Sequence, residues 1–248
     1  MITHALVRPP GASFSRAISS SAAAVDVGLA RAQHAEYRQA LAAADVRVMV
    51  LPPDERYPDS CFMQDPALVI DGIAVIARPG AASRQGEEDA LAAALVGRFP
   101  LARIAPPGTL EGGDVLILPD RVVAGHSGRT NRAGIAQLAV AAPLRVHEVP
   151  VAGYLHLLTA VTHLRDGLLL AIEGFNLPPV LADLPVLRVP ADEGYACNAL
   201  AVGDKVILPA GYSKTAAMLK AHGFDVLPVP TTEFAKADGG VTCLALTW

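Results

Sequence analysis

The chain has 248 residues, of which 52% are hydrophobic, 18% charged and 5% aromatic. This composition excludes a disordered chain and predicts one globular domain over residues 1–248, packed around an aliphatic core. The formal net charge of −4, without a cluster of lysines and arginines, excludes a nucleic-acid-binding surface, and the apolar runs are too short to span a membrane.

Predicted hairpins and helices alternate along the chain. Short apolar arms around tight turns predict four β-hairpins, and Asp-Gly turns such as Asp71-Gly72 are a strong signal for them. The hairpins span residues 67–77, 115–123, 161–171 and 199–208. Segments rich in alanine and leucine predict helices at residues 25–44, 84–98, 130–141 and 212–222. This alternation predicts the α/β class.

Short β-rich segments complete most of these units. They lie at residues 46–51, 102–105, 144–149 and 226–230. The units recur at roughly 35 to 50 residues, a spacing typical of propellers. Pairing the N-terminal strand 4–8 with the C-terminal strand 241–247 adds a fifth unit and closes a ring around a central channel. The alternative is a doubly wound parallel sheet, which the tight hairpins argue against.

Two acidic segments lie directly before predicted hairpins. The sequence PDSCFMQDP contains Asp59 and Asp65, and LEGGDV contains Glu111 beside a glycine pair that allows a tight backbone. Carboxylates next to buried strands are costly unless they are paired with a cation. Taken singly, each segment is also compatible with a plain turn or loop.

Two arginines, a histidine and a cysteine are further candidates. Arg84 and Arg129 each stand at a predicted helix start, where the helix dipole disfavours a cation, so we expect them to face an anion such as a carboxylate. His156 lies in the apolar run YLHLLT, and Cys243 follows a glycine pair on the predicted last strand. The simpler interpretations are solvated arginines, a core histidine and an inert thiol.

The ordered set of these segments is more specific than any one of them. It reads PDSxFxxDP, SR, LEGGD, GRTN, HL and DGGVTC, and it resembles the guanidine-modifying (pentein) superfamily, most closely the dimethylarginine dimethylaminohydrolases. The resemblance extends from about Arg16 to Cys243, and the chain length fits that family better than the longer arginine deiminases. It implies a five-bladed α/β propeller, in agreement with the five units counted above.

The resemblance also implies a role for each matching residue. Cys243 matches the nucleophile that attacks the guanidinium carbon, His156 the acid/base, and Glu111 the carboxylate that orients the histidine. The implied reaction is hydrolysis of Nω-methylated arginine, a small cationic amino acid, to citrulline and a methylamine through a covalent thiouronium adduct. The residues expected at the substrate are Gln64, Asp65 and Asp238 near the guanidinium, Arg84 and Arg129 at the α-carboxylate, and Asp59 with the backbone carbonyls of Ile18 and Ala237 at the amino end.

Two positions depart from the family pattern. The family usually has a glutamate where this chain has Gln64, and commonly a lysine where it has Leu158. The loss of the glutamate's negative charge at Gln64 predicts weaker binding of the guanidinium or a changed preference among methylated forms of arginine. Arginine deiminases typically have an aspartate in place of Leu158, so the leucine argues against deimination of arginine. Hydrolysis of another guanidino compound, and a non-catalytic propeller that binds a partner, stay open.

The chemistry expected of these residues requires no metal or organic cofactor. The three cysteines are odd in number and lack zinc-site spacing, so we expect a reducing, cytoplasmic environment, with Cys61 and Cys197 in packing roles. The first residues show no pattern of a signal peptide. We expect no nucleic-acid or membrane partner, while a homodimer stays open. The segment 9–21, rich in proline and glycine at its start, could form a lid.

Overall fold

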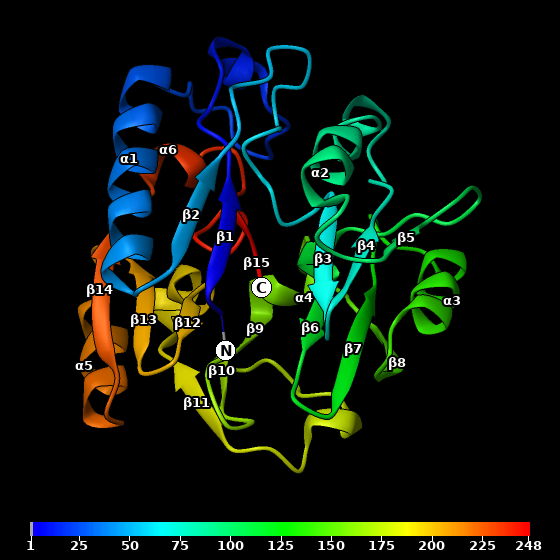
Figure 1. Cartoon of the computed structure of the whole chain (residues 1–248). Coiled ribbons are helices and arrows are strands. Elements are labelled where there is room, and N and C mark those ends of the chain that lie inside the picture. Colours follow the sequence, from blue (N-terminus) through cyan, green and yellow to red (C-terminus); the bar gives the residue numbers. More distant parts are fainter. Residues whose placement is uncertain (1) are drawn as a thin grey trace.

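Five three-stranded sheets make up the computed structural model, which describes residues 2–248 (Figure 1). In each sheet the middle strand pairs antiparallel with one neighbour and parallel with the other. The sheets are β15–β1–β2 (Ala245–Thr247, His4–Val7, Arg47–Val50), β3–β4–β5 (Ala67–Ile70, Ile73–Ile76, Leu101–Arg103), β6–β7–β8 (Val115–Ile117, Arg121–His126, Arg145–Pro150), β9–β10–β11 (Val161–His163, Leu169–Ile172, Val186–Val189) and β12–β13–β14 (Leu200–Val202, Lys205–Pro209, Asp225–Val229). The five repeated units confirm the predicted α/β architecture.

Four helices connect a middle strand to its parallel neighbour, because parallel strands need a crossover. These helices are α1 (Val27–Ala43), α2 (Glu88–Leu95), α3 (Arg132–Ala141) and α5 (Ser213–Ala221), and they lie on the outside of the molecule (Figure 1). The side chains of Asp26 and Asn131 cap α1 and α3 by accepting backbone N–H bonds. Short elements fill the loops: α4 (Leu157–Ala160), α6 (Thr232–Ala235), and the 3-10 turns η1 (Ala12–Arg16), η2 (Ala82–Arg84), η3 (Gly112–Asp114), η4 (Pro179–Leu181) and η5 (Ala191–Cys197).

The two ends of the chain share one sheet, as predicted. Strand β1 lies between β15 and β2, with Ala5 opposite Thr247 in the antiparallel pair and His4 opposite Arg47 in the parallel pair. The ring of His4 also stacks on that of Trp248, with centroids 5.5 Å apart. The C-terminal strand thus completes a unit begun at the N-terminus, which holds the loop before β15 in the middle of the molecule (Figure 1).

Two predictions about elements were wrong, and one strand was missed. The last strand starts at Ala245, so Cys243 lies in the turn before it and not on the strand. The predicted helix 84–98 begins only at Glu88, because Gly86 has a φ of 108° that no α-helix accommodates. Strand β11 was missed because its crossover contains the 3-10 turn η4 in place of a helix, so the helical signal that marks the other units is absent from the sequence there.

Apolar side chains fill the space between neighbouring sheets. One cluster joins Ile70 and Val75 of the second sheet to Val122 of the third and Leu138 of α3. Since these clusters occupy the interior between sheets, the polar loops that precede the strands meet near the centre. Over residues 2–248, no helix is both long and apolar enough to cross a membrane.

Candidate active site

Two adjoining cavities lie where the loops before β3, β6, α4 and β15 meet. Ten of the eleven residues expected at the site line the first cavity, and Gln64 lines the second. The two cavities share His156, Asp238, Gly239 and Cys243. The first is lined by Ile18, Asp59, Phe62, Asp65, Arg84, Glu111, Arg129, Leu155, His156, Ala237, Asp238, Gly239 and Cys243. The fold therefore gathers at one place residues that are far apart in the sequence.

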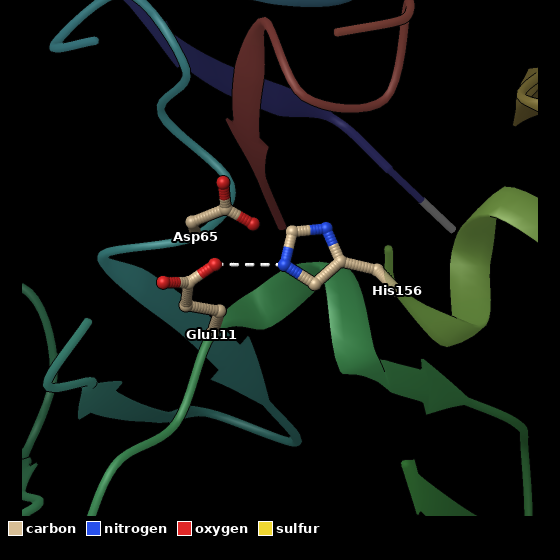
Figure 2. Close-up of side chains that lie close together, drawn as sticks. All are labelled: Asp65, Glu111 and His156. Atoms are coloured by element: carbon tan, nitrogen blue, oxygen red, sulfur yellow. Dashed lines mark hydrogen bonds and ion pairs between the residues drawn. The ribbon is translucent and has the colours of Figure 1, made fainter. Parts of the chain in front are cut away.

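His156 and Glu111 form a buried pair in the first cavity. His156 Nε2 lies 2.7 Å from Glu111 Oε2, and Figure 2 shows the two side chains facing each other. Glu111 Oε1 accepts a hydrogen bond from Gly80 N at 3.0 Å and lies 3.5 Å from Arg129 Nη1. Burial opposes ionisation of Glu111, but the bond from His156 and nearby positive charges outweigh it and lower its pKa to about 2. The carboxylate is ionised at neutral pH and can only accept, so Nε2 carries the proton and Nδ1 is the other ring position.

Burial disfavours the protonated imidazole, yet the pKa of His156 is raised. The neighbouring carboxylates of Asp65 and Glu111 outweigh the cost of burial. These carboxylates favour the protonated imidazole, the form that a general acid needs. The expectation of a merely buried core histidine therefore does not fit this environment.

Gly113 allows His156 and Asp65 to approach each other. A Cβ atom at this position would lie 2.7 Å from His156 Nδ1, closer than real Cβ contacts, and 3.0 Å from Asp65 Oδ1, closer than most of them. The Gly113 N–H instead donates to Asp65 Oδ1 at 3.1 Å. Asp65 lies beside the imidazole in Figure 2, so the glycine pair of LEGGD serves a tight contact at the site itself and not only a flexible loop.

Arg84 is buried and pairs with the protein's own carboxylates. Its Nη1 lies 2.7 Å from Asp65 Oδ2, its Nε and Nη2 contact Glu87, and Nη2 also donates to the Phe62 carbonyl oxygen. Arg84 was expected to bind the substrate α-carboxylate, but the carboxylates that it contacts here belong to the protein, and its side chain is only 4% exposed. The sequence reasoning missed Glu87, although its i,i+3 spacing from Arg84 was visible. Burial raises the pKa of Glu87 to about 7 even though the arginine opposes this shift.

Asp114, which follows the glycine pair, is a second residue that the sequence reasoning missed. Its Oδ1 accepts from Leu157 N at 3.0 Å, directly after His156, and its Oδ2 accepts from Ser127 Oγ at 2.6 Å. Ser127 Oγ in turn accepts from the backbone N–H groups of Arg129 and Thr130. Asp114 is fully buried and links the loop that carries His156 to the loop that carries Arg129.

Two further predicted residues hold the N-terminal segment against the site. Asp59 Oδ1 accepts from Ile18 N at 3.1 Å, and burial raises the pKa of Asp59. Asp238 accepts from both the backbone N–H and the hydroxyl of Ser20, each at 2.6 Å. The end of the segment singled out as a lid is therefore tied to two carboxylates of the first cavity, with Ile18 among its lining residues.

Residue Cys243 is partly exposed although its thiol is buried, whereas Cys61 and Cys197 are fully buried, as expected of packing residues. Its Sγ accepts from Gly240 N at 3.4 Å within the turn before β15. Burial and the nearby charge of Asp65 raise the pKa of Cys243 to about 11. Without a bound cation the thiol is therefore protonated at neutral pH.

One set of three potential metal ligands occurs within residues 2–248, and it is this same cluster. Donor atoms of Asp65, Glu111 and His156 lie within 4.8 Å of one another (Figure 2). His156 and Glu111 are hydrogen-bonded to each other, and Arg84 Nη1 already forms an ion pair with Asp65 Oδ2 at 2.7 Å. A metal ion here would meet a guanidinium group, so the arrangement suits proton transfer and cation pairing better than metal binding.

Comparison with known proteins gives the family. A family model described as N,N dimethylarginine dimethylhydrolase, eukaryotic, matches residues 12–157. The N(G),N(G)-dimethylarginine dimethylaminohydrolase of Pseudomonas aeruginosa is 38% identical over 99% of both chains. The chain belongs to the dimethylarginine dimethylaminohydrolase family. The protein of the same name from Streptomyces coelicolor is 39% identical over 90% of this chain and 87% of its own length.

Solved structures agree with this family membership. The Pseudomonas aeruginosa enzyme in complex with citrulline superimposes with a TM-score of 0.95, at 37% identity and full coverage of both chains. The N-terminal domain of ArgZ, described as an arginine dihydrolase, has a TM-score of 0.88 over 99% of this chain at 24% identity, a likeness of fold alone. The five-bladed propeller implied by the sequence is thereby confirmed.

Proposed function

We propose that this protein hydrolyses Nω-methylated arginine to citrulline and a methylamine or dimethylamine, with Cys243 as nucleophile and His156 as acid/base. The observation that carries the proposal is the buried pair of His156 and ionised Glu111 in a cavity that Cys243 also lines. Family relatives carry this activity in their names, and one was crystallised with citrulline.

The reaction begins when the Cys243 thiolate attacks the guanidinium carbon. A C–S bond forms, and the bond from that carbon to the substituted nitrogen breaks as His156 gives this nitrogen a proton. The amine leaves, and the substrate stays attached as an S-alkylthiouronium. Because Nε2 is held by Glu111, we assign the transferred proton to Nδ1 of His156.

Water completes the turnover. Neutral His156 takes a proton from a water molecule, whose oxygen attacks the thiouronium carbon. The C–S bond then breaks and the new hydroxyl group loses its proton to solvent, which restores the thiolate of Cys243 and releases citrulline. Glu111 stays ionised throughout and stabilises the imidazolium whenever His156 is protonated.

The substrate's own charge supports formation of the thiolate. The pKa of Cys243 lies near 11 because of burial and the negative charge of Asp65. A guanidinium bound beside the sulfur opposes both effects, since it neutralises Asp65 and favours the anionic thiolate. The nucleophile therefore ionises when the correct cation is bound.

Arg129 is the stronger candidate for the α-carboxylate. Its side chain is 20% exposed and lines the first cavity. Arg84 lines the same cavity, but most of its N–H groups are already bonded to Asp65, Glu87 and the backbone. We therefore propose that Arg129 binds the substrate α-carboxylate directly. Arg84 holds the carboxylate of Asp65 in place. For the amino end, we retain Asp59 and the carbonyls of Ile18 and Ala237.

The test is citrulline formation from asymmetric dimethylarginine, monomethylarginine and arginine, measured in parallel. Activity on methylated substrates that Cys243→Ser abolishes and Cys61→Ala retains supports the proposal. Activity on arginine alone would assign the chain to deimination, against which Leu158 argues. Retention of full activity by Cys243→Ser would refute the mechanism.

We retain the cytoplasm as the expected location, because all three cysteines are free thiols in residues 2–248. A homodimer stays a prediction that size-exclusion chromatography with light scattering would test.

A further inference from the structure

The residue directly before the nucleophile is held by two hydrogen bonds to one distant side chain. Thr242 N donates to Asn198 Oδ1 at 2.9 Å, and Asn198 Nδ2 donates to Thr242 Oγ1, also at 2.9 Å. Asn198 follows η5 and lies 44 positions earlier in the chain, and Thr242 is only 5% exposed. Gly240 leaves room for this contact, because a Cβ atom there would lie 2.4 Å from Asn198 Oδ1. The Thr242 hydroxyl is thus fixed in place beside the nucleophile.

These two bonds determine how the Thr242 hydroxyl is used. A backbone N–H can only donate, so the oxygen of the Asn198 amide faces Thr242 N, and its NH₂ group faces Thr242 Oγ1. The hydroxyl oxygen therefore accepts a hydrogen bond from Asn198. Its single proton is left to be donated to another group.

Two acceptors lie within reach of that proton. Thr242 Oγ1 donates to Gln64 Oε1 at 3.0 Å. The side chain of Thr242 also forms a hydrogen bond with the thiol of Cys243. Gln64 and Cys243 are themselves joined, since Gln64 N donates to the Cys243 carbonyl oxygen at 3.2 Å, and both residues line the second cavity. One hydroxyl proton is thus shared between an amide oxygen and the sulfur.

The charge on the sulfur determines which acceptor is favoured. A neutral thiol is a weak acceptor, so the hydroxyl donates to Gln64 Oε1 while Cys243 is protonated. Hydrogen bonds to an ionised acceptor are roughly twice as strong as those between neutral groups, so the hydroxyl donates to the sulfur once Cys243 ionises. Burial and the charge of Asp65 raise the pKa of Cys243 to about 11, whereas the bonds from Gly240 N and Thr242 oppose that rise.

We propose that the Thr242 hydroxyl is a catalytic group, which donates a hydrogen bond to the Cys243 thiolate both when the sulfur attacks and when it leaves. Its effect on turnover rests on the hydrolysis proposed above. The hydroxyl keeps its own proton at every step. When the C–S bond forms, the sulfur loses its charge and the hydroxyl returns to Gln64 Oε1. When the C–S bond breaks, the electron pair returns to the sulfur and the hydroxyl donates to it again. The hydroxyl therefore has an acceptor in each state, and no step leaves this buried donor unsatisfied.

Alkylation of Cys243 by iodoacetamide at about pH 9 tests this bond without any substrate, because only the thiolate reacts. Thr242→Val is similar in shape but lacks the hydroxyl. It should react about three- to tenfold more slowly than the wild type, since the lost bond raises the thiol pKa and a more reactive thiolate offsets only part of that effect. Thr242→Ser retains the hydroxyl and should react at the wild-type rate.

The matched control is Thr215→Val in α5. It also removes a buried hydroxyl, which donates to Glu193 Oε2 at 2.6 Å, and it should leave the alkylation rate unchanged. The charged residues of both cavities are the same in every variant. A Thr242→Val protein that reacts as fast as the wild type, or a Thr242→Ser protein as slow as Thr242→Val, overturns the proposal.

Gln64→Met separates this role from a purely structural one. Methionine has a similar length but lacks the competing amide oxygen, so the Thr242 hydroxyl is left to the sulfur alone. Alkylation of Cys243 should then accelerate by about twofold or more. A hydroxyl that only fixes the turn predicts no acceleration, so an unchanged or slower rate overturns the proposal. This variant decides the matter should Thr242→Val fail to fold.

Turnover measures the catalytic consequence. In Thr242→Val, kcat for citrulline formation should fall by about tenfold or more with little change in KM, because the hydroxyl contacts the sulfur and not the substrate. Thr242→Ser should restore most of it. Full kcat in a Thr242→Val protein whose alkylation is slowed overturns the catalytic role. A wild type that forms no citrulline overturns the proposed hydrolysis alone, while the alkylation rates still decide whether the hydroxyl binds the thiolate.

Discussion

Replacement of Asp114 by asparagine tests whether this buried carboxylate positions His156. Asp114 accepts two hydrogen bonds, from Leu157 N at 3.0 Å and from Ser127 Oγ at 2.6 Å. An asparagine has one oxygen, so one of these donors would face an NH₂ group. Ser127 cannot easily reverse its bond, because its oxygen already accepts from the N–H groups of Arg129 and Thr130. One buried polar group is therefore left unsatisfied.

The expected loss of stability follows from that single defect. An unsatisfied buried donor costs about 1–3 kcal/mol. For a chain of this size, each kcal/mol lowers Tm by roughly 2–4 °C, so Asp114→Asn should melt about 2–12 °C below the wild type. Calorimetry or a thermal-shift assay measures this. Asp120→Asn is the matched control, because Asp120 is exposed and its pair with Arg121 lies at the surface, where such pairs contribute little.

The same substitution should alter catalysis in a way that simple destabilisation does not. Asp114 is one of the carboxylates that hold the pKa of His156 above its ordinary value, after Asp65 and Glu111 have offset the cost of burial. Without its charge the pKa of His156 falls. The limb on which activity declines with rising pH should therefore move to lower pH, with kcat/KM reduced by about 10- to 100-fold. A folded Asp114→Asn protein with wild-type Tm and an unshifted pH profile would refute the reasoning.

Four further predictions concern the groups around the thiol. Gly113→Ala should lower kcat sharply with little loss of secondary structure by circular dichroism, because the new Cβ would displace the His156 ring; normal turnover would contradict the 2.7 Å contact. Arg84→Met should cost about 3–5 kcal/mol in urea unfolding, since it leaves two buried carboxylates without their cation; a loss under about 1 kcal/mol would contradict this. The pKa of Glu111 is lowered in the folded state, so the stability that this carboxylate contributes is present above its unfolded pKa of about 4.5 and is lost as pH falls toward about 2. Glu111→Gln should therefore make the free energy of unfolding less dependent on pH between about 4.5 and 2. An unchanged pH dependence would contradict the ion pair of Glu111 with His156. Alkylation of Cys243 by iodoacetamide should be slow at pH 7 and accelerate as pH rises toward about 11, as mass spectrometry of the labelled peptide would show, whereas rapid labelling at pH 7 without substrate would contradict a raised pKa.

Local sequence patterns predicted much of the fold and identified the residues of the site. Tight turns between apolar arms, such as Asp71-Gly72, depend on neighbouring residues alone, so the hairpins were predictable. The strand pairing of the two termini was predicted because it adds the fifth unit and closes the ring. The residues expected at the site were found by their order along the chain, and all of them line the two cavities. Strand β11 was missed because its crossover lacks the helical pattern on which the repeat was recognised.

Only the tertiary structure decided how the side chains of the site are partnered. Arg84 was expected at the substrate, but it is held mainly by Asp65 and Glu87, and this depends on where a turn before α2 lies against the loop before β3. Asp114 and Leu157 are 43 positions apart, so no local pattern shows that one holds the other. Likewise, Thr242 Oγ1 lies 3.0 Å from Gln64 Oε1, although the two residues are 178 positions apart. Hydrogen bonds act over about 3 Å, so their partners become known only when the chain has brought distant residues together.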